Sequence, residues 1–271
     1  MTDVDRSDAY SLDQIRQLWT DQAKQHGQSA KASWSDLPVI EMEVRELLNW
    51  LNDGESVLDA GCANGYTSVQ LASQKRLRIH GIDYIPDMIH QAKSRLEGMR
   101  DVLLGDVTFD EGDVTDLSSL KDTYDKVVVV RVIINLGTWD RQAAGIRECL
   151  RVLKPGGRLL LSEATVQGWH RLNVFRREWG LPDIPMPPFN NYLDEDRVAE
   201  CIAPEAKLID VVNFASTYYV ATRVMKPLLA RNAWAPVNIA SPEMEFNRFV
   251  SMLPPFGDYG TQKLFVIEKT A

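Results

Sequence analysis

Cysteine is scarce and scattered in this sequence, which argues against a disulfide-stapled or zinc-stapled fold. The three cysteines, Cys62, Cys149 and Cys201, are odd in number and lie far apart. They form neither a disulfide framework nor the closely spaced pairs of a zinc site. No apolar run approaches the roughly 18 residues of a membrane span, and the polar start lacks the basic and apolar regions of a signal peptide. We therefore expect a cytoplasmic protein with no membrane partner.

Basic residues are outnumbered by acidic ones, which argues against a nucleic-acid partner. The chain has 30 lysines and arginines against 38 aspartates and glutamates, a formal net charge of −8. Such a surface repels phosphate-rich polymers unless cations cluster locally. Basic side chains gather at residues 95–100 and 170–177, but neither stretch forms a run. A small-molecule partner is the expectation that follows.

What the sequence does contain is a regular alternation of apolar strands and amphipathic helices. A chain of 271 residues with 45% hydrophobic content can bury a full core. Residues 124–132 are nearly continuous in β-branched side chains, as in a central parallel strand covered on both faces. The alternation predicts an α/β fold with a doubly wound, seven-stranded, mostly parallel sheet and helices on both faces. Its strands are expected at residues 55–60, 77–83, 107–113, 124–132, 158–162, 206–214 and 262–268.

Two segments after the fifth predicted strand do not fit this alternation. Residues 163–193 contain four prolines and many aromatic side chains, which favours an ordered insertion over a crossover helix. Residues 215–260 are too long for a hairpin loop. Because ligands in open α/β sheets bind beyond the carboxyl ends of the strands, we interpret both segments as caps over an active site. A dimerisation arm, and with it a possible homodimer, is the alternative.

The turn after the first predicted strand is suited to a nucleoside ligand. Gly61 lets the backbone turn sharply, and Gly65 lets the next helix approach a ligand without a Cβ in the way. Asp83, at the end of the second strand, can accept two hydrogen bonds from ribose hydroxyls. Asp113 is placed to accept from an adenine amino group while the Val114 N–H donates to a ring nitrogen. A simple turn acid explains Asp113 equally well.

Four motifs resemble, in order and spacing, the motif series of the class I, Rossmann-like, S-adenosylmethionine-dependent methyltransferases that act on small molecules. They are D-A-G-C-A-N-G at 59–65, G-I-D-Y-I-P-D-M at 81–88, G-D-V-T-D-L at 112–117 and R-V-L-K-P-G-G-R-L at 151–159. The resemblance covers about half of the chain, roughly residues 41–163. It implies S-adenosylmethionine as the cofactor and S-adenosylhomocysteine as the product.

The resemblance also implies which residues contact the cofactor, with Cys62 contributing by position only. The implied contacts are Asp59, Gly61, Cys62, Ala63 and Gly65 for the methionine part, Asp83 for the ribose, Tyr84, Met88, Asp113 and Val114 for the adenine, and Val130 and Arg131 beside the amino group and sulfonium. By the same analogy, residues 1–37, with Trp19, His26 and Trp34, form an N-terminal helical lid hinged at residues 33–36. Residues 38–271 then form the methyltransferase domain, with cap insertions at about 163–193 and 215–260.

A dinucleotide dehydrogenase is the structural rival, because it uses the same acid on the same ribose. Its first turn needs G-x-G-x-x-G to bring backbone N–H groups onto a pyrophosphate. This chain has Cys62 and Ala63 inside the turn and the acidic Asp59 just before it. A negative charge there suits an amine and a sulfonium better than phosphates.

The loop after the fourth predicted strand narrows the subclass. Residues 133–138 read I-I-N-L-G-T, which is neither the Asn-Pro-Pro-Tyr type of clamp for exocyclic amines of bases nor the Pro-Cys nucleophile of cytosine C5 enzymes. Arg131 and Asn135 also cannot supply the acid cluster that chelates magnesium in catechol-type enzymes. We therefore expect no metal in the site.

Two residues near the end of the fifth strand are candidate catalytic bases. Glu163 ends the strand, and His170 follows in what reads as a loop; histidine is the better base near neutral pH. The alternatives are a surface histidine and a buried carboxylate that anchors a loop through backbone N–H groups. The candidate substrate contacts are Asn135, Trp169, Asn190, Asn191, Tyr192, Tyr218 and Tyr219. The alternative for the aromatic residues among them is that they form the core of the cap and do not contact a ligand.

The predicted function is metal-independent O- or N-methylation of a small molecule, such as a sugar or natural-product intermediate, by in-line displacement. Methylation of a protein or nucleic acid is a second hypothesis, and a non-catalytic adenosylmethionine-binding module is a third. The acceptor and the methylated atom are not encoded in any local motif.

Overall fold

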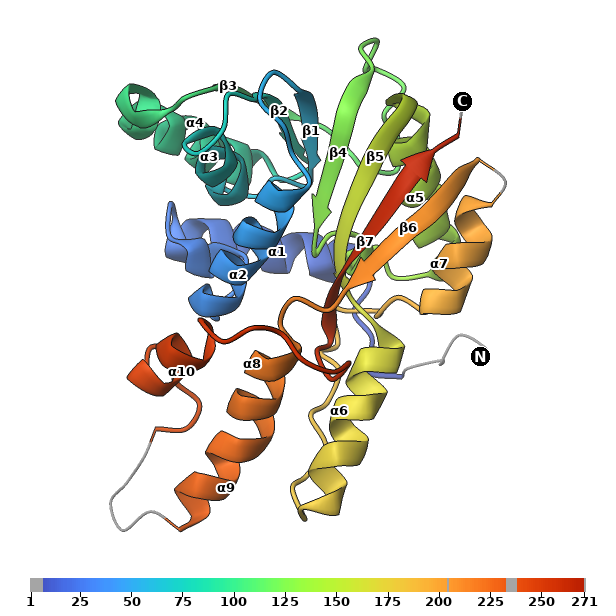
Figure 1. Ribbon diagram of the computed structural model, residues 1–271. Coiled ribbons are helices and arrows are strands. Elements are labelled where there is room, and N and C mark those ends of the chain that lie inside the picture. The colour runs from blue at the N-terminus through green and yellow to red at the C-terminus, as the bar shows by residue number, and fades with distance from the viewer. Residues whose placement is uncertain (1–6, 204, 233–237, 271) are drawn as a thin grey trace.

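The computed structural model of the protein describes residues 7–203, 205–232 and 238–270, and its described strands form one sheet of seven (Figure 1). The strand order is β3-β2-β1-β4-β5-β7-β6; all neighbours are parallel except β7, which runs antiparallel to β5 and β6. The predicted α/β fold is confirmed. The strands are β1 (Ser56–Ala60), β2 (Arg78–Asp83), β3 (Asp106–Glu111), β4 (Tyr124–Val130), β5 (Leu153–Ala164), β6 (Ala206–Val212) and β7 (Gln262–Lys269).

Side chains that alternate along the strands build a separate core on each face of the sheet. Val57 and Val128 pack with α2 (Leu37–Asn49), α3 (Tyr66–Ala72) and α4 (Pro86–Met99) on one face. Their neighbours Leu58 and Val129 pack with α5 (Trp139–Arg151) and α7 (Glu195–Ile202) on the other. The central strands are therefore buried on both faces, as their near-continuous apolar sequence predicts.

Residues 163–193 begin with a helix that the sequence analysis did not identify. Helix α6 (Val166–Glu178) is capped by Thr165, whose hydroxyl accepts from the Gly168 N–H at 3.1 Å. The four prolines that favoured an insertion over a crossover helix all lie after its end, from Pro182 onward. His170 therefore sits on a helix and not in a loop.

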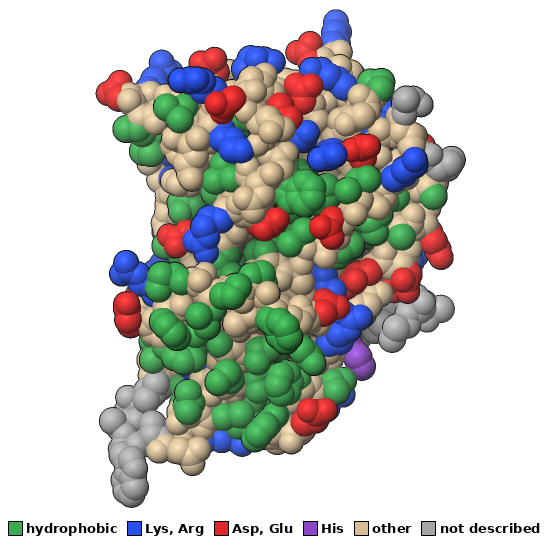
Figure 2. All heavy atoms as spheres, viewed as in Figure 1, with side chains coloured by type: hydrophobic (Ala, Val, Ile, Leu, Met, Phe, Trp, Pro, Cys, Tyr) green, Lys and Arg blue, Asp and Glu red, His purple; other side chains and the backbone are tan. Residues whose placement is uncertain are grey.

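Helices from both predicted insertions extend beyond the carboxyl ends of the parallel strands, in the lower half of Figure 1. The cap, as we call it, consists of α6 and of α8 (Ser216–Val220), the π-helical turn η4 (Ala221–Met225), α9 (Lys226–Arg231) and α10 (Glu245–Val250). Apolar side chains gather on the part of the surface formed by the cap (Figure 2). Leu229 of α9 is exposed, as are Met252 and Phe256, which follow α10. Among the described residues, no helix has the length and apolar character needed to cross a bilayer.

Before the sheet, the chain forms a helix that packs across α4. Helix α1 (Leu12–His26) begins at Ser11 with a capping box, in which Ser11 and Gln14 exchange hydrogen bonds. A short 3-10 turn, η1 (Ala30–Ala32), then leads to α2. The predicted lid of residues 1–37 falls on these elements, although residues 1–6 lie outside the described part of the chain. The division at residue 37 stays a prediction.

Candidate functional site

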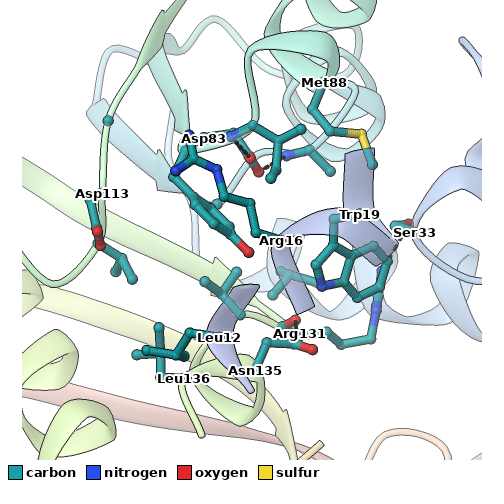
Figure 3. A pocket seen from close by; sticks show the side chains of 18 of the residues that line it. Leu12, Arg16, Trp19, Ser33, Asp83, Met88, Asp113, Arg131, Asn135 and Leu136 are labelled. Atoms are coloured by element: carbon teal, nitrogen blue, oxygen red, sulfur yellow. Dashed lines mark hydrogen bonds between the residues drawn. The ribbon is translucent and has the colours of Figure 1, made fainter. Parts of the chain in front are cut away.

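A cavity lies where the carboxyl ends of β1, β2 and β4 meet α1 (Figure 3). Asp83 and Asp113 approach it from the strand ends, and Arg131 and Asn135 approach from the opposite side. Most of the residues predicted to contact the cofactor line this cavity: Gly61, Ala63, Asp83, Tyr84, Met88, Asp113, Val114, Val130 and Arg131.

Asp83 is the best-defined polar group of the cavity. Its side chain is only 8% exposed, and each carboxylate oxygen accepts one backbone N–H, from Ala63 and from Ile85, both at 2.9 Å. Burial raises the pKa of the Asp83 carboxyl to about 6, although these two hydrogen bonds act in the opposite direction. The carboxylate is held in one orientation, and its remaining lone pairs are available for the hydroxyls of a ribose.

Three predicted cofactor contacts lie beneath the cavity and do not line it. Asp59 is buried and accepts a 2.5 Å hydrogen bond from the Ser68 hydroxyl, so its carboxylate braces the start of α3. Cys62 packs into the core beneath the turn. A Cβ on Gly65 would meet the Phe109 ring at 2.6 Å, so Gly65 permits close packing of helix on strand. None of the three residues lines the cavity, so their direct contact with a ligand stays a prediction.

The backbone at the end of β4 adopts an unusual conformation that aims Arg131 into the cavity. Arg131 has φ 57°, in the left-handed region that residues other than glycine rarely adopt. Its guanidinium pairs with the buried Glu43 carboxylate and lies 5.2 Å from the centroid of the Trp34 ring. Glu43 is held in turn by the Ser162 hydroxyl at 2.5 Å. Backbone strain of this kind is concentrated at functional sites.

Polar atoms without a partner mark one end of the same cavity. Within the described residues, Arg131 Nε, Arg141 Nε and Asn135 Oδ1 are buried and have no hydrogen-bond partner. All three residues line the cavity. A buried polar group without a partner costs about 1–3 kcal/mol, so these atoms are suited to a ligand with both an anionic and a cationic group. The α-carboxylate and α-ammonium of the methionine part of S-adenosylmethionine fit that description.

Asp113 serves as both a turn acid and a wall of the cavity. One of its carboxylate oxygens, Oδ1, accepts from the N–H and the hydroxyl of Thr115 at 2.8 and 2.7 Å. The residue also lines the cavity beside Val114. The turn interpretation is seen in these hydrogen bonds, and the contact with adenine stays a prediction.

Helix α1 closes the cavity with one of its faces, which the sequence did not identify residue by residue. Leu12, Arg16 and Trp19 line the cavity at helical spacing, and the Arg16 guanidinium lies 5.9 Å from the centroid of the Tyr84 ring. The end of α1 is tied to the glycine turn because the Asn64 amide donates to the carbonyls of Gly27 and Ser29, at 2.8 and 2.7 Å. The i, i+4, i+7 spacing of Leu12, Arg16 and Trp19 was the sequence signal that could have identified this face. No sequence signal marks Arg141 as a cavity residue.

Neither of the two predicted catalytic bases, Glu163 and His170, lines the cavity. Glu163 is fully buried, and its Oε1 accepts from the backbone N–H groups of Val132 and Ile133 at 2.8 and 2.7 Å. It is therefore the loop anchor that was the alternative. His170 is exposed on α6 in the cap.

Among the predicted substrate contacts, only Asn135 lines the cavity. Asn191 fixes the loop after β4 through hydrogen bonds to Ile134 and Gly137, and Asn190 precedes it. Tyr218 and Tyr219 are buried in α8, as the cap-core alternative holds. Trp169 and Tyr192 are half-buried, with the ring of Trp169 edge-on to that of Tyr192, and neither lines the cavity.

We expect that replacing His170 with glutamine leaves methyl transfer nearly unchanged. A general base contributes roughly 10²- to 10⁴-fold, and an exposed side chain outside the cavity cannot supply it. The measurement is turnover with an isotopically labelled methyl donor. A loss of about 10²-fold or more would restore His170 as the base.

Comparisons with known proteins agree with this geometry. Residues 57–157 match the family described as "Methyltransferase domain". Methyltransferase GfsG of Streptomyces halstedii is 31% identical over 117 residues, which are 42% of this chain and 40% of that protein. O-methyltransferase resE of Aspergillus sclerotiorum is 29% identical over 110 residues, 41% of this chain and 40% of that protein. The chain spans about half the length of the curated relatives it matches, or less.

Solved structures share the whole fold at low sequence identity. Magnesium protoporphyrin IX methyltransferase from Synechocystis PCC 6803, with bound SAH, has a TM-score of 0.62 and 16% identity, covering 96% of this chain and 100% of that one. The [4+2]-cyclase SpnF has a TM-score of 0.54 and 19% identity, covering 85% and 81%. These likenesses establish the fold alone. Across the described residues, no group of three or more His, Cys, Asp or Glu is placed to hold a metal ion.

Proposed function

We propose, from the premise that residues 57–157 form a methyltransferase domain of the class I type, that this chain methylates a hydroxyl or amine of a small molecule. The donor is S-adenosylmethionine, which supplies a methyl group already activated by its sulfonium. A sugar or a natural-product intermediate is the acceptor class we favour. A relative named as an O-methyltransferase supports a hydroxyl as the methylated group.

The observation that carries the proposal is the pairing of two kinds of polar group in one cavity. Asp83 presents a fixed carboxylate at one end, and Arg131, Arg141 and Asn135 leave buried polar atoms without partners at the other. A nucleoside that carries an amino acid group complements both ends at once. A dinucleotide could also place a ribose on Asp83, but its pyrophosphate has no donor to offer the acceptor atom of Asn135.

The residues of the chain contribute mainly by binding and orientation. Displacement at a sulfonium needs the acceptor atom about 3 Å from the methyl carbon, and holding it there supplies most of the acceleration. Helix α1 excludes water by covering the cavity with Leu12 and Trp19. With Glu163 and His170 outside the cavity, an amine must arrive unprotonated, and a hydroxyl must lose its proton to another group or to water.

The remaining expectations are kept as proposals. A protein or nucleic-acid acceptor is disfavoured by the net charge of −8. A cytoplasmic location is in keeping with the sequence, and a homodimer stays a prediction.

Two measurements test the proposal. Calorimetry with S-adenosylhomocysteine tests the cofactor site, and incubation of metabolite fractions with an isotopically labelled methyl donor tests turnover. Binding without incorporation into any fraction would favour a non-catalytic adenosylmethionine-binding module. Incorporation into RNA or protein instead would identify a macromolecular acceptor.

A further inference from the structure

A second cavity lies within the cap, next to the first. It is bounded by α6, by the helical run from η4 to α9, by residues 34–36 and by residues 239–247. Part of its wall is apolar, from Trp34, Ile184, Pro227 and Ile239. Nothing in the cofactor site described above uses it.

Three cations and one carboxylate from the described residues line this second cavity. The cations are Arg176, Arg223 and Lys226, and the carboxylate is Asp36. The Asp36 carboxylate is already used within the protein, because it accepts hydrogen bonds from Arg223 and from the Tyr218 hydroxyl, at 2.5 and 2.7 Å. The wall therefore carries two positive charges in excess.

Arg176 and Lys226 are buried cations whose hydrogen-bond partners are all neutral. Lys226 is 5% exposed and donates to the Ser241 carbonyl and to Asn247 Oδ1 at 2.8 and 2.7 Å. Arg176 is 8% exposed and donates to the carbonyls of Pro182 and Arg223. No ion pair to either is found in the described part of the chain. Burying a charge without a counter-charge is costly, which indicates that the missing negative charge comes from a ligand.

Nearby groups do not neutralise these two cations. Asp183 lies close enough to act on Arg176, but its carboxylate is held by two hydrogen bonds from Arg177, at 2.7 and 2.8 Å. Burial and the neighbouring Arg223 charge lower the pKa values of Arg176 and Lys226. An anion seated between them would reverse that effect.

The second cavity is separated from the first by a single segment. Ser33 lines the first cavity and Trp34 lines the second, and the Trp34 ring contacts the Arg131 guanidinium that lines the first. The two cavities therefore adjoin at residues 33–34, beside Arg131.

We propose that the second cavity binds an anionic group, a carboxylate or phosphate, of the methyl acceptor, through Arg176 and Lys226 with the aromatic face of Trp34 beside it. This inference rests on the proposed function and adds the substrate class: the acceptor is an acid with an apolar body. The acid anchors the molecule, and a different atom of it receives the methyl group.

The experiment measures binding of two small anions by calorimetry, with and without saturating S-adenosylhomocysteine. The probes are benzoate and inorganic phosphate, and benzyl alcohol is the neutral match for benzoate. We expect one of the anions to bind and benzyl alcohol to bind at least about tenfold more weakly, because it lacks the charge. Benzoate and phosphate distinguish the two sources of the anionic group.

Three variants locate that binding. Lys226→Met should weaken the anion at least about tenfold, while Lys226→Arg, which keeps the charge, restores most of the affinity. Arg176→Gln should match Lys226→Met. The control is Arg248→Gln, which removes an exposed cation of the cap that does not line the second cavity and should leave anion affinity unchanged. S-adenosylhomocysteine affinity reports whether each variant is folded.

The possible failures are distinct. If neither anion binds, if benzyl alcohol binds as well as benzoate, or if Lys226→Met and Arg176→Gln bind the anion like the parent protein, the anion site is overturned. If S-adenosylhomocysteine does not bind, the proposed function fails, while the anion titration of the free protein still decides whether the second cavity is an anion site.

Discussion

Replacing Asp83 with alanine is expected to weaken S-adenosylhomocysteine binding by about 1.5–3 kcal/mol, or roughly 10- to 150-fold. The variant loses the charge-assisted hydrogen bonds from the ribose hydroxyls. Because the carboxylate of the wild type is already held in one orientation, binding costs little ordering of this side chain, and the whole energy of these bonds contributes to affinity. The measurement is calorimetry. The matched control is Asp87→Ala, which removes a carboxylate from the first turn of α4 that is about half exposed.

The same titration over pH provides a second readout. Ribose hydroxyls donate to the ionised carboxylate, and the pKa of Asp83 without ligand is about 6. Affinity should therefore be constant well above pH 6 and fall as the pH drops below it, by up to about tenfold per pH unit. The Asp83→Ala variant should lack this fall. Asp59 has a similar pKa but lies outside the cavity, so Asp59→Asn should retain it. Unchanged affinity in Asp83→Ala would contradict the ribose assignment.

Replacing Glu163 with alanine is expected to lower the free energy of unfolding by about 3–5 kcal/mol. The variant leaves the Val132 and Ile133 N–H groups buried without their acceptor and opens space beside β5. Glu163→Gln retains a carbonyl oxygen for the same two donors and should lose far less. Urea unfolding measures both. Similar stability of the two variants would show that these hydrogen bonds matter little.

The stability difference between wild type and Glu163→Gln should also depend on pH. Burial raises the pKa of the folded Glu163 carboxyl to about 8, from 4.5 for an ordinary glutamate. A raised folded pKa contributes stability that is complete below pH 4.5 and is lost as the pH rises toward 8. The wild type should therefore lose stability, relative to Glu163→Gln, by a few kcal/mol between pH 5 and pH 8. Parallel stability curves would show that Glu163 titrates normally.

Local patterns were sufficient to predict the sheet and most of the cavity. The valine-rich stretch of β4 and the glycine turn after β1 are short-range signals, because their residues meet each other or the adjacent strand. Asp83 and Arg131 then follow, since the carboxyl ends of parallel strands lie at one edge of the sheet. These residues line the cavity as the order of the strands requires.

The cap could not be predicted in the same way, because its contacts join distant parts of the chain. Tyr218 bonds Asp36 across 182 positions, and no local pattern marks either as a partner of the other. Helix α6 was missed because the prolines after it influenced the interpretation of the whole segment. Glu163 ends a strand at the edge where ligands bind, yet its carboxylate turns inward to the β4 loop. Side-chain direction of this kind is set by tertiary packing.

Asp36 links the segment before α2 to the cap through two hydrogen bonds. Asp36 follows α1 and η1 in the chain, and α1 lines the first cavity. Its bonds to Tyr218 and Arg223 reach α8 and η4, and η4 lines the second cavity. Because Asp36 is buried and bonded to both Tyr218 and Arg223, we expect a displacement of α1 to be transmitted to the wall of the second cavity. Exchange of the spent donor and entry of the next acceptor would then depend on the same few bonds.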